Sequence, residues 1–464
     1  MKKRYILVFV FLIILILGCI FVEVDFTNFD MGIGIPSIRL RNYFKGNEED
    51  IDTKSAGAEM SISPIEGMYN DSLLNKDSNE YVDIYQDERV KELCKDMNDK
   101  RYQYEALETN KEKKCYELIE SSIFNICSEC KQSGIYPIKR IFIPDEQFND
   151  KEIKNAMYAV ESDNPFIFWI SDVFSFAYNG KGTIIELRSI KSPEECKWAC
   201  ENINNVIKKV NESIYDYELK RNSSIDSDFY KELYIHDFII GRCDYDNKVD
   251  NINDSWSVFT AYGALVDRKA VCEGYSKATK LLLNKNGISC RLITGKSGNV
   301  LHMWNMVKIN NDWYHLDVTW DESNKNVKYN YFNVTDEMIN LDHQISYNEY
   351  GNKYLPKCIN DSFNYFNVKA HKIYALDAIS DESIVNKLVT LVNNNEYVMT
   401  IMICEGLDYK GTINKMFYES PYKFFYYVKE ANKRLNNSRQ IDYSNMRISL
   451  CDHMKSAIIK FSLK

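Results

Sequence analysis

The stretch "AVCEGYSKATKLLLNKNGISC", residues 270–290, places a cysteine where a helix is expected to begin. Tyr275 and Leu282 recur on one helical face, and Gly287 is typical of a helix C-terminus. Cys272 therefore lies in the predicted first turn, where free backbone N–H groups and the helix dipole favour a thiolate. This position makes it a candidate nucleophile. The alternative is an inert buried thiol, because free cysteine is among the most buried residue types.

Two predicted strands follow this helix. They are "VLHMWNMVKI", residues 300–309, and "DWYHLDVTW", residues 312–320, and apolar residues alternate with polar ones along both. Between them stand Asn310 and Asn311, a pair that tolerates positive φ and is typical of a two-residue hairpin loop. The sequence therefore predicts an antiparallel hairpin.

The register of that hairpin would gather polar side chains on one face. Trp304 would lie opposite Asp317, and His302 opposite Thr319. His302 and Asp317 would then be diagonal neighbours about 7–8 Å apart, a spacing that long side chains can bridge. A carboxylate in this place can hold an imidazole in one tautomer beside a thiolate. We therefore predict a catalytic site made of Cys272, His302 and Asp317.

Other residues near these motifs are candidates for further roles in the site. Asp312 at the turn and Asp321 beyond the second strand are alternative carboxylates, and we expect both to be solvated. Trp304, Trp320 and Gly274 are candidates for the lining of a substrate cleft. The competing interpretation of the two tryptophans is that they belong to the core.

Three stretches together carry a resemblance to a known family. They are "ALVDRKAVCEGYSKATKLLLNKNGISCRLITG" (264–295), "LHMWNMVKINNDWYHLDVTWDES" (301–323) and "YNYFNVTDEMINLDH" (329–343). Over about residues 230–345 the chain resembles the transglutaminase-like superfamily, specifically the bacterial branch found in clostridial-type surface proteins. The three motifs in this order are specific for a fold and less specific for a reaction.

The resemblance implies an α+β, papain-like core, in which a helix with a nucleophilic cysteine packs on an antiparallel sheet. It implies that Cys272 is the nucleophile, His302 the base and Asp317 the orienting carboxylate, and it implies no cofactor. The superfamily contains cross-linking enzymes, cysteine proteases, glycan amidases and inactive members. Three functions therefore stay open: an amide hydrolase acting on protein or cell-wall peptide, a transglutaminase, and a non-catalytic cell-surface binding protein. The complete triad favours an enzyme.

The N-terminus predicts a membrane attachment. Residues 1–4 are basic at three positions, and residues 5–22 are apolar throughout. An apolar run of roughly 20 residues spans a bilayer, and the basic flank stays in the cytoplasm. We therefore predict a cytoplasmic tip, a single-pass anchor and an extracytoplasmic remainder. The alternative is a lipoprotein attached through Cys19 in "ILGC".

Composition divides the remaining chain into four segments. We expect a flexible tether at 23–80, an N-terminal α+β domain at 81–220, a catalytic domain at 221–356 and a C-terminal α/β domain at 357–464. The α+β domains on both sides of the core carry clear local signals. They include a hairpin around "NGKG", a capping box in "SPEE" and a strand pair at the C-terminus.

Charge and cysteine content exclude several classes of protein. The net charge is −9 and no basic stripe occurs, which argues against a nucleic-acid partner. The thirteen cysteines of the 464 residues form no regular framework. "CSEC" at 127–130 and the pair Cys196 and Cys200 offer too few ligands for zinc, so we predict no metal.

Overall fold

The computed structural model describes residues 80–464 except for 96–100, 130–133, 172, 179, 220–226, 248–255, 324–325, 348–351, 374–380, 405, 421 and 453. The predicted tip, anchor, Cys19 and nearly all of the tether lie outside the described residues. None of the helices in the described ranges has the length and apolar character that a membrane crossing needs. One compact unit ends at Tyr365, and Phe366–Lys464 belong to a second. The domain boundaries at 220 and 356 stay predictions.

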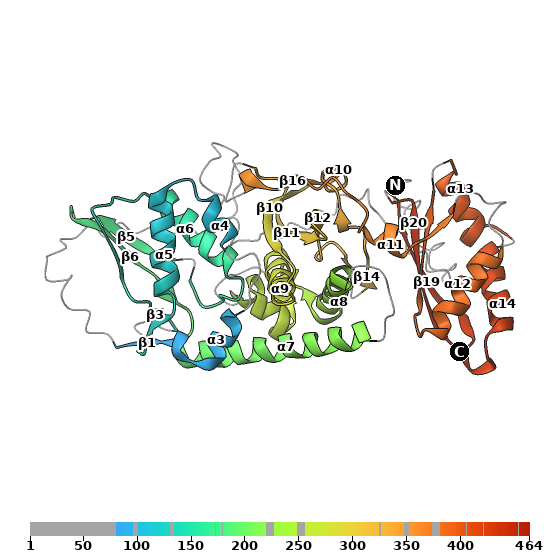
Figure 1. Ribbon diagram of the computed structural model, residues 1–464, viewed down its shortest axis with the longest axis horizontal. Coiled ribbons are helices and arrows are strands. Elements are labelled where there is room, and N and C mark those ends of the chain that lie inside the picture. Colours follow the sequence, from blue (N-terminus) through green and yellow to red (C-terminus); the bar gives the residue numbers. More distant parts are fainter. Residues whose placement is uncertain are drawn as a thin grey trace, which may run out of the picture. The chain divides into compact units, whose positions relative to one another are not determined.

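The first part of the larger unit mixes helices with short strands (Figure 1). Its helices are η2 (Ile84–Gln86, a 3-10 helix), α3 (Glu88–Cys94), α4 (Tyr102–Ala106), α5 (Asn110–Ser122), α6 (Asp150–Asp163) and α7 (Pro193–Leu219). Its strands are β1 (Tyr81–Asp83), β2 (Asn125–Cys127), β3 (Tyr136–Pro137), β4 (Ile141–Pro144), β5 (Ser175–Tyr178), β6 (Gly182–Glu186) and β7 (Arg188–Ser189).

Two local predictions for this part are confirmed. The segment around "NGKG" is a hairpin, because β5 and β6 pair antiparallel with Tyr178 opposite Thr183. Helix α7 begins with the predicted capping box. The backbone N–H of Ser192 donates to the Glu195 carboxylate at 2.8 Å, and the Glu195 N–H donates to the Ser192 hydroxyl at 3.2 Å.

The second part of the larger unit carries the predicted site. Its helices are α8 (Ser227–Arg242), η4 (Trp256–Phe259, a 3-10 helix), η5 (Gly263–Asp267, a π-helix), α9 (Cys272–Lys285), α10 (Asp336–Ile339), η6 (Asn352–Tyr354) and α11 (Tyr365–Lys369), which runs on into the second unit. Its strands are β8 (Asp244–Tyr245), β9 (Lys269–Ala270), β10 (Cys290–Ser297), β11 (Val300–Ile309), β12 (Asp312–Leu316), β13 (Glu322–Ser323), β14 (Asn326–Val327), β15 (Phe332–Val334) and β16 (His343–Ile345).

An antiparallel sheet and one helix form the centre of this part. The strands follow the order β15-β12-β11-β10-β16, and α9 packs against β10 and β11. Every residue of α9 from Cys272 to Asn284 is buried, so the helix is enclosed on all sides. Gly287 follows the helix with a φ of +81°, the left-handed conformation that glycine adopts readily at a helix end.

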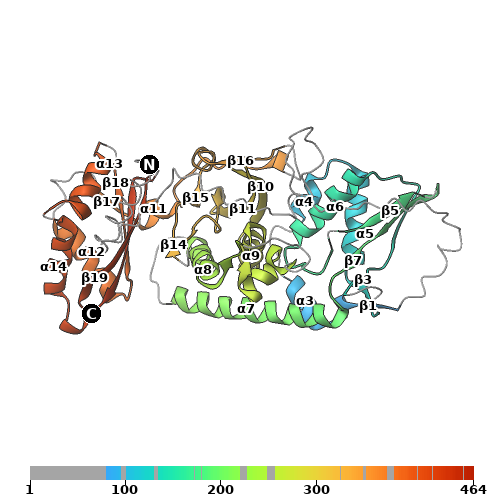
Figure 2. The ribbon, with the colours of Figure 1, turned by 180° about the vertical axis from the view of Figure 1, so that it is seen from behind.

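The first and second parts are joined by buried charges on α9. Lys277 places its Nζ 2.7 Å from a Glu273 oxygen and 3.4 Å from a Glu161 oxygen on α6. Helix α7 contacts both α3 and α8, and it runs below them in both views of the ribbon (Figures 1 and 2). Because a buried charge needs a partner, the first part helps to stabilise the helix that bears Cys272.

The second unit has one mixed sheet of order β17-β18-β20-β19, with its helices on one face (Figure 1). Only β17 and β18 are parallel in this sheet. Its elements are β17 (His371–Ile373), α12 (Asp381–Asn393), β18 (Val398–Ile403), α13 (Tyr409–Ile413), η7 (Asn414–Tyr418, a π-helix), α14 (Lys423–Arg434), η8 (Asn437–Arg439, a 3-10 helix), β19 (Ile441–Cys451) and β20 (Ser456–Leu463). The predicted terminal strand pair is confirmed as β19 and β20.

Candidate active site

The predicted hairpin forms with the predicted loop. Strands β11 and β12 pair with Ile309 opposite Asp312, so the loop consists of two residues. Asn310 and Asn311 have φ values of 49° and 79°, as a type I′ turn requires. The sequence-based prediction of this turn is therefore confirmed.

The ladder is shorter than the sequence suggested. It ends with the pair Asn305–Leu316, so the two outer pairs predicted for His302 and Asp317 do not form. Asp317 leaves the strand and donates its backbone N–H to the carbonyl of Tyr331 at 3.1 Å. The position of its side chain is therefore set by the following turn and not by strand pairing.

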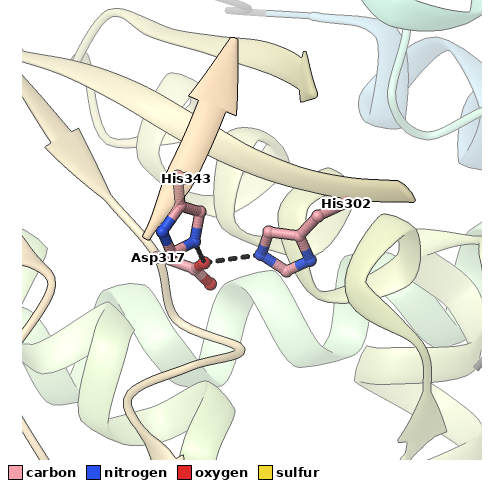
Figure 3. Close-up of side chains that lie close together, drawn as sticks. All are labelled: His302, Asp317 and His343. Carbon is pink, nitrogen blue, oxygen red and sulfur yellow. Dashed lines mark hydrogen bonds and ion pairs between the residues drawn. The ribbon is translucent and has the colours of Figure 1, made fainter. Parts of the chain in front are cut away.

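His302 and Asp317 nevertheless meet directly (Figure 3). The Nε2 of His302 lies 2.6 Å from Oδ2 of Asp317, and both side chains are buried. The other carboxylate oxygen accepts the backbone N–H groups of Thr319 at 2.9 Å and Trp320 at 3.0 Å. Burial alone would raise the pKa of Asp317, but His302 and His343 hold it below its usual range.

Sequence reasoning missed His343, the first residue of β16. Its Nε2 lies 3.0 Å from Oδ2 of Asp317, and its Nδ1 lies 2.6 Å from Oδ1 of Asp342. Burial lowers the pKa of His343, yet these two carboxylates raise it to about 9. The residue ends the motif "YNYFNVTDEMINLDH", so its presence in the third resembling stretch was the available signal.

Cys272 is the first residue of α9, as predicted, and Val271 is the N-cap. The side chain of Cys272 packs in a small apolar cluster with Leu301 and Met303, the two residues that flank His302 on β11. The thiol therefore lies beside the strand segment that carries the imidazole.

Two hydrogen bonds fix the helix to that strand. The Ser276 hydroxyl, one turn beyond Cys272, donates to the carbonyl of Met303 at 2.9 Å. The side-chain amide of Asn305 donates to the carbonyl of Ser276 at 3.0 Å. Because both bonds are buried, they fix the position of the first turns of α9 along strand β11.

The thiol of Cys272 differs electrostatically from the sequence-based prediction. Burial raises its pKa to about 12, while hydrogen bonding to the backbone of Met303 and Glu273 lowers the pKa only in part. The charges of Glu273 and Asp317 raise it further. The prediction that the helix start favours a thiolate is therefore wrong for the free site, because desolvation outweighs the helix terminus.

The three residues predicted to line a substrate cleft differ in their burial and contacts. A Cβ at Gly274 would lie 2.4 Å from the carbonyl oxygen of Val258, so this glycine serves internal packing and its assignment to a cleft was wrong. Trp304 is fully buried, which corrects its placement in an open cleft wall and supports the core interpretation. Trp320 is 41% exposed, and its ring lies edge-on to that of His302 at 6.2 Å between centroids. Only Trp320 remains a cleft candidate.

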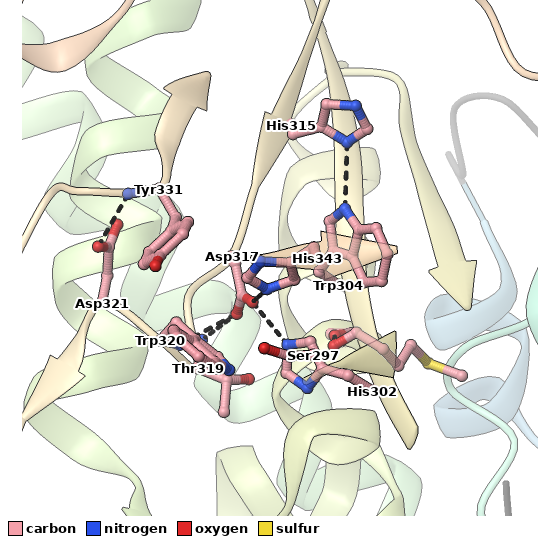
Figure 4. Close-up of polar contacts among 12 residues, drawn as sticks. Ser297, His302, Trp304, His315, Asp317, Thr319, Trp320, Asp321, Tyr331 and His343 are labelled. Atoms are coloured by element: carbon pink, nitrogen blue, oxygen red, sulfur yellow. Dashed lines mark hydrogen bonds and ion pairs between the residues drawn. The ribbon is translucent and has the colours of Figure 1, made fainter. Parts of the chain in front are cut away.

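The two alternative carboxylates, Asp312 and Asp321, also differ in burial and in their hydrogen-bond partners. Asp312 is half-buried and accepts a hydrogen bond from the Asn360 amide at 2.7 Å. Asp321 is fully buried, which contradicts its predicted exposure. Its Oδ2 lies 3.2 Å from Nε2 of His236, and its Oδ1 accepts the Tyr331 N–H at 3.1 Å (Figure 4). After Asp317 the chain turns into the protein interior and buries Asp321. The alternating pattern of the predicted strand gave no sign of this turn.

Two groups in the described ranges bring three candidate metal ligands together. The first consists of His302, Asp317 and His343, and the second of His315, Asp336 and Cys358. In the first group, the ring nitrogens that face Asp317 donate hydrogen bonds to it. A hydrogen-bonded network accounts for this group without an ion.

Hydrogen bonding also decides whether the second group can bind a metal ion. The indole N–H of Trp304 donates to Nδ1 of His315 at 3.1 Å (Figure 4). The proton of a neutral His315 is therefore on Nε2, which donates to Asp336 at 3.1 Å. Burial lowers the pKa of His315, which favours this neutral form. The nitrogen that faces Asp336 has no free lone pair, so these residues do not fit a metal.

Comparisons with known proteins locate a family match at this site. Residues 218–318 match the family model of the transglutaminase-like superfamily. This match and the helix-on-sheet arrangement confirm the predicted fold class: the described residues are α+β and include a transglutaminase-like domain. His343 lies beyond the matched residues.

Two solved structures are similar to part of the chain. A cysteine protease candidate from Cytophaga hutchinsonii is 12% identical, with a TM-score of 0.20, over 41% of this chain and 68% of that chain. A TGase is 18% identical, with a TM-score of 0.20, over 39% of this chain and 50% of that chain. The chain thus spans half the length of that TGase. No curated protein sequence matches the chain.

Proposed function

We propose that this transglutaminase-like domain is a cysteine enzyme that transfers or hydrolyses an acyl group at an amide bond. Cys272 is the nucleophile, His302 the general base and acid, and Asp317 the orienting carboxylate. The observation that carries the proposal is the 2.6 Å contact between the buried His302 and Asp317, beside the strand segment against which Cys272 packs.

The orientation of the imidazole assigns the proton transfers. Nε2 of His302 faces Asp317 (Figure 3), so Nδ1 is the proposed acceptor of the Cys272 proton. The Sγ–C bond forms as this proton moves, and the same proton then passes to the departing amine as the C–N bond breaks. Water or a second amine resolves the acyl-enzyme. A thiol with a raised pKa makes this base-assisted attack necessary.

The developing oxyanion needs hydrogen-bond donors. The proposed donor is the backbone N–H of Cys272 at the start of α9. The Tyr245 hydroxyl hydrogen-bonds to the backbone of Cys272. The substrate oxygen would replace this hydroxyl when it enters.

A paired assay tests the proposal. The full chain is incubated with a glutamine-donor peptide and a labelled amine, and in parallel with protein and cell-wall peptides whose amide bonds are followed by mass spectrometry. Incorporation of the amine identifies a transglutaminase, and cleavage identifies a hydrolase. Cys272→Ala should abolish either signal, while Cys404→Ala, at a half-buried thiol of the second unit, should retain it.

One observation favours the alternative of an inactive or weak domain that acts as a cell-surface binding protein. The thiol of Cys272 is almost fully buried, and its pKa lies far above neutrality. Binding of the same peptides that is equal in the wild type and Cys272→Ala, with no turnover in either, would support this alternative against the enzyme.

We also propose that the enzyme is membrane-anchored and extracytoplasmic, on the basis of the N-terminal sequence alone. Residues 5–22 would be the anchor, and Cys19 would be the acylated residue of the alternative lipoprotein. Protease added to intact cells should digest the chain beyond the anchor. A labelled fatty acid supplied to the cells should become attached to the wild type, but not to Cys19→Ser, if the protein is a lipoprotein, and to neither protein if the anchor is correct.

A further inference from the structure

Two imidazoles share the carboxylate of Asp317. Its Oδ2 lies 2.6 Å from Nε2 of His302 and 3.0 Å from Nε2 of His343 (Figure 3). Its Oδ1 accepts the backbone N–H groups of Thr319 and Trp320. A carboxylate has about four lone-pair sites, and four donors are directed at this one. Asp317 is therefore ionised and fixed in orientation.

The second imidazole also contacts another carboxylate. Nδ1 of His343 lies 2.6 Å from Oδ1 of Asp342, an exposed residue whose Oδ2 accepts the Tyr331 hydroxyl at 2.5 Å. Ionised carboxylates only accept hydrogen bonds, whereas a neutral imidazole has a single N–H. Both nitrogens of His343 therefore donate, and the ring between Asp342 and Asp317 is an imidazolium.

We propose that His343 is a positioning residue of the active site, and that its cation, held between Asp342 and Asp317, orients Asp317 toward His302 and keeps His302 neutral at rest. This inference rests on the proposed function, in which His302 must accept a proton from Cys272. A His302 that was already protonated could not act as that base.

The charges around the site give the physical reason. Asp317 and His343 together are neutral, so protonation of His302 would add a second cation to a buried site, 5.3 Å from the His343 ring between centroids. In the part of the chain that the structure describes, the other titratable groups that face His343 are Tyr331 and His315. Both are neutral near pH 7, because burial raises the pKa of Tyr331 and lowers that of His315.

The arrangement also predicts a dependence on pH. The pKa of His343 is raised to about 9, so its charge is present at neutral pH and is lost above that value. Loss of the charge leaves Asp317 with its full negative charge beside His302. The proton affinity of His302 should therefore increase when His343 is neutralised.

The test follows the histidine rings of the full chain by NMR with ¹³C-labelled histidine, since the sequence has only six. In the wild type we expect His343 to titrate near pH 9. His343→Gln, which keeps a donor but removes the charge, should increase the proton affinity of His302 about tenfold or more. Asp342→Asn, at an exposed position, should weaken proton binding at His343 and shift His302 in the same direction.

His236 provides the internal control, because it pairs with Asp321 and its titration should be unchanged in both variants. A His343 that titrates below pH 7, or a His302 midpoint that neither variant moves, would overturn the inference. No substrate is needed for these measurements. Expected titrations without any turnover would contradict the proposed function alone, and turnover with an unmoved His302 would contradict this inference alone.

Discussion

Two buried aspartates of the described domain, Asp317 and Asp321, pair with histidines, and they differ in how their carboxylates are satisfied. Nε2 of His302 lies 2.6 Å from Asp317, and Nε2 of His236 lies 3.2 Å from Asp321. Asp317 receives two imidazoles and two backbone N–H groups, and its pKa is lowered in spite of burial. Asp321 receives His236 and the Tyr331 N–H, and burial raises its pKa. Two fully buried carboxyl groups thus have pKa values shifted in opposite directions, because they accept different numbers of hydrogen bonds.

The histidines of the two pairs differ as well. His236 uses both ring nitrogens, on Asp237 and Asp321, and its ring stacks on Tyr329 at 5.3 Å between centroids. His302 uses Nε2, and no hydrogen bond to its Nδ1 is found among the described residues. A buried histidine–aspartate pair is therefore no sign of catalysis by itself. A ring nitrogen without a hydrogen bond among the described residues distinguishes His302 from His236.

Substitution of each aspartate by asparagine should reveal the largest difference between the two pairs, as a loss of kcat. Loss of the orienting carboxylate costs about 10⁴ in kcat in a serine protease, which is an upper guide for Asp317→Asn because a thiol depends less on its base. Asp321→Asn should lower kcat less than about tenfold, since the Asp321 side chain bonds to His236 and the Tyr331 backbone and not to the imidazole of His302. Both are measured in the same turnover assay. Equal losses would show that the wrong pair has been placed in the active site.

The neighbourhood of the second pair should make stability depend on pH. Glu232 lies one turn before His236 on α8, and burial raises its pKa from 4.5 to about 8. The folded state therefore keeps a proton that the unfolded chain releases, so stability should fall as pH rises from about 4.5 to 8, by up to about 5 kcal/mol. Glu232→Gln should flatten this slope. Thermal unfolding at pH 5 and pH 8 measures it, and parallel slopes in the two proteins would contradict the assignment.

Removal of one histidine at a time tests which pair depends more on its partner. His236→Ala leaves Asp321 with a single backbone donor, and breaking a buried pair in this way costs about 3–5 kcal/mol. His302→Ala leaves Asp317 with His343 and two backbone N–H groups, so its loss of stability should be clearly smaller. Denaturant midpoints of the two variants give the order. A larger loss for His302→Ala would reverse it.

The smallest effect concerns the thiol beside the first pair. Because burial raises the pKa of Cys272 to about 12, this thiol should react with iodoacetamide at pH 7 at least about tenfold more slowly than the half-buried Cys404. Mass spectrometry of the full chain at timed intervals compares the two. Faster labelling of Cys272 would indicate a thiolate at rest and would restore the prediction made from its helix-start position.

Local patterns predicted much of this site. The apolar period placed α9 with Cys272 at its first residue, and two adjacent asparagines fixed the loop between β11 and β12. These features depend on neighbours within a few positions of the chain, where steric rules apply directly. The same loop predicted that His302 and Asp317 would meet, but the turn after β12 brings Asp317 to the imidazole, because the ladder ends before either residue.

The sequence by itself determined the α+β class and the helix that begins at Cys272, and it named His302 and Asp317 as partners, although through strand pairs that do not form. Only the tertiary structure brought His343 to Asp317, 26 residues away, buried Asp321 against His236, and showed that Gly274 faces Val258. It also reversed the expected ionisation of Cys272. The physical reason is that burial and the number of hydrogen-bond donors are set by segments distant in sequence, and periodicity along one segment contains no information about either.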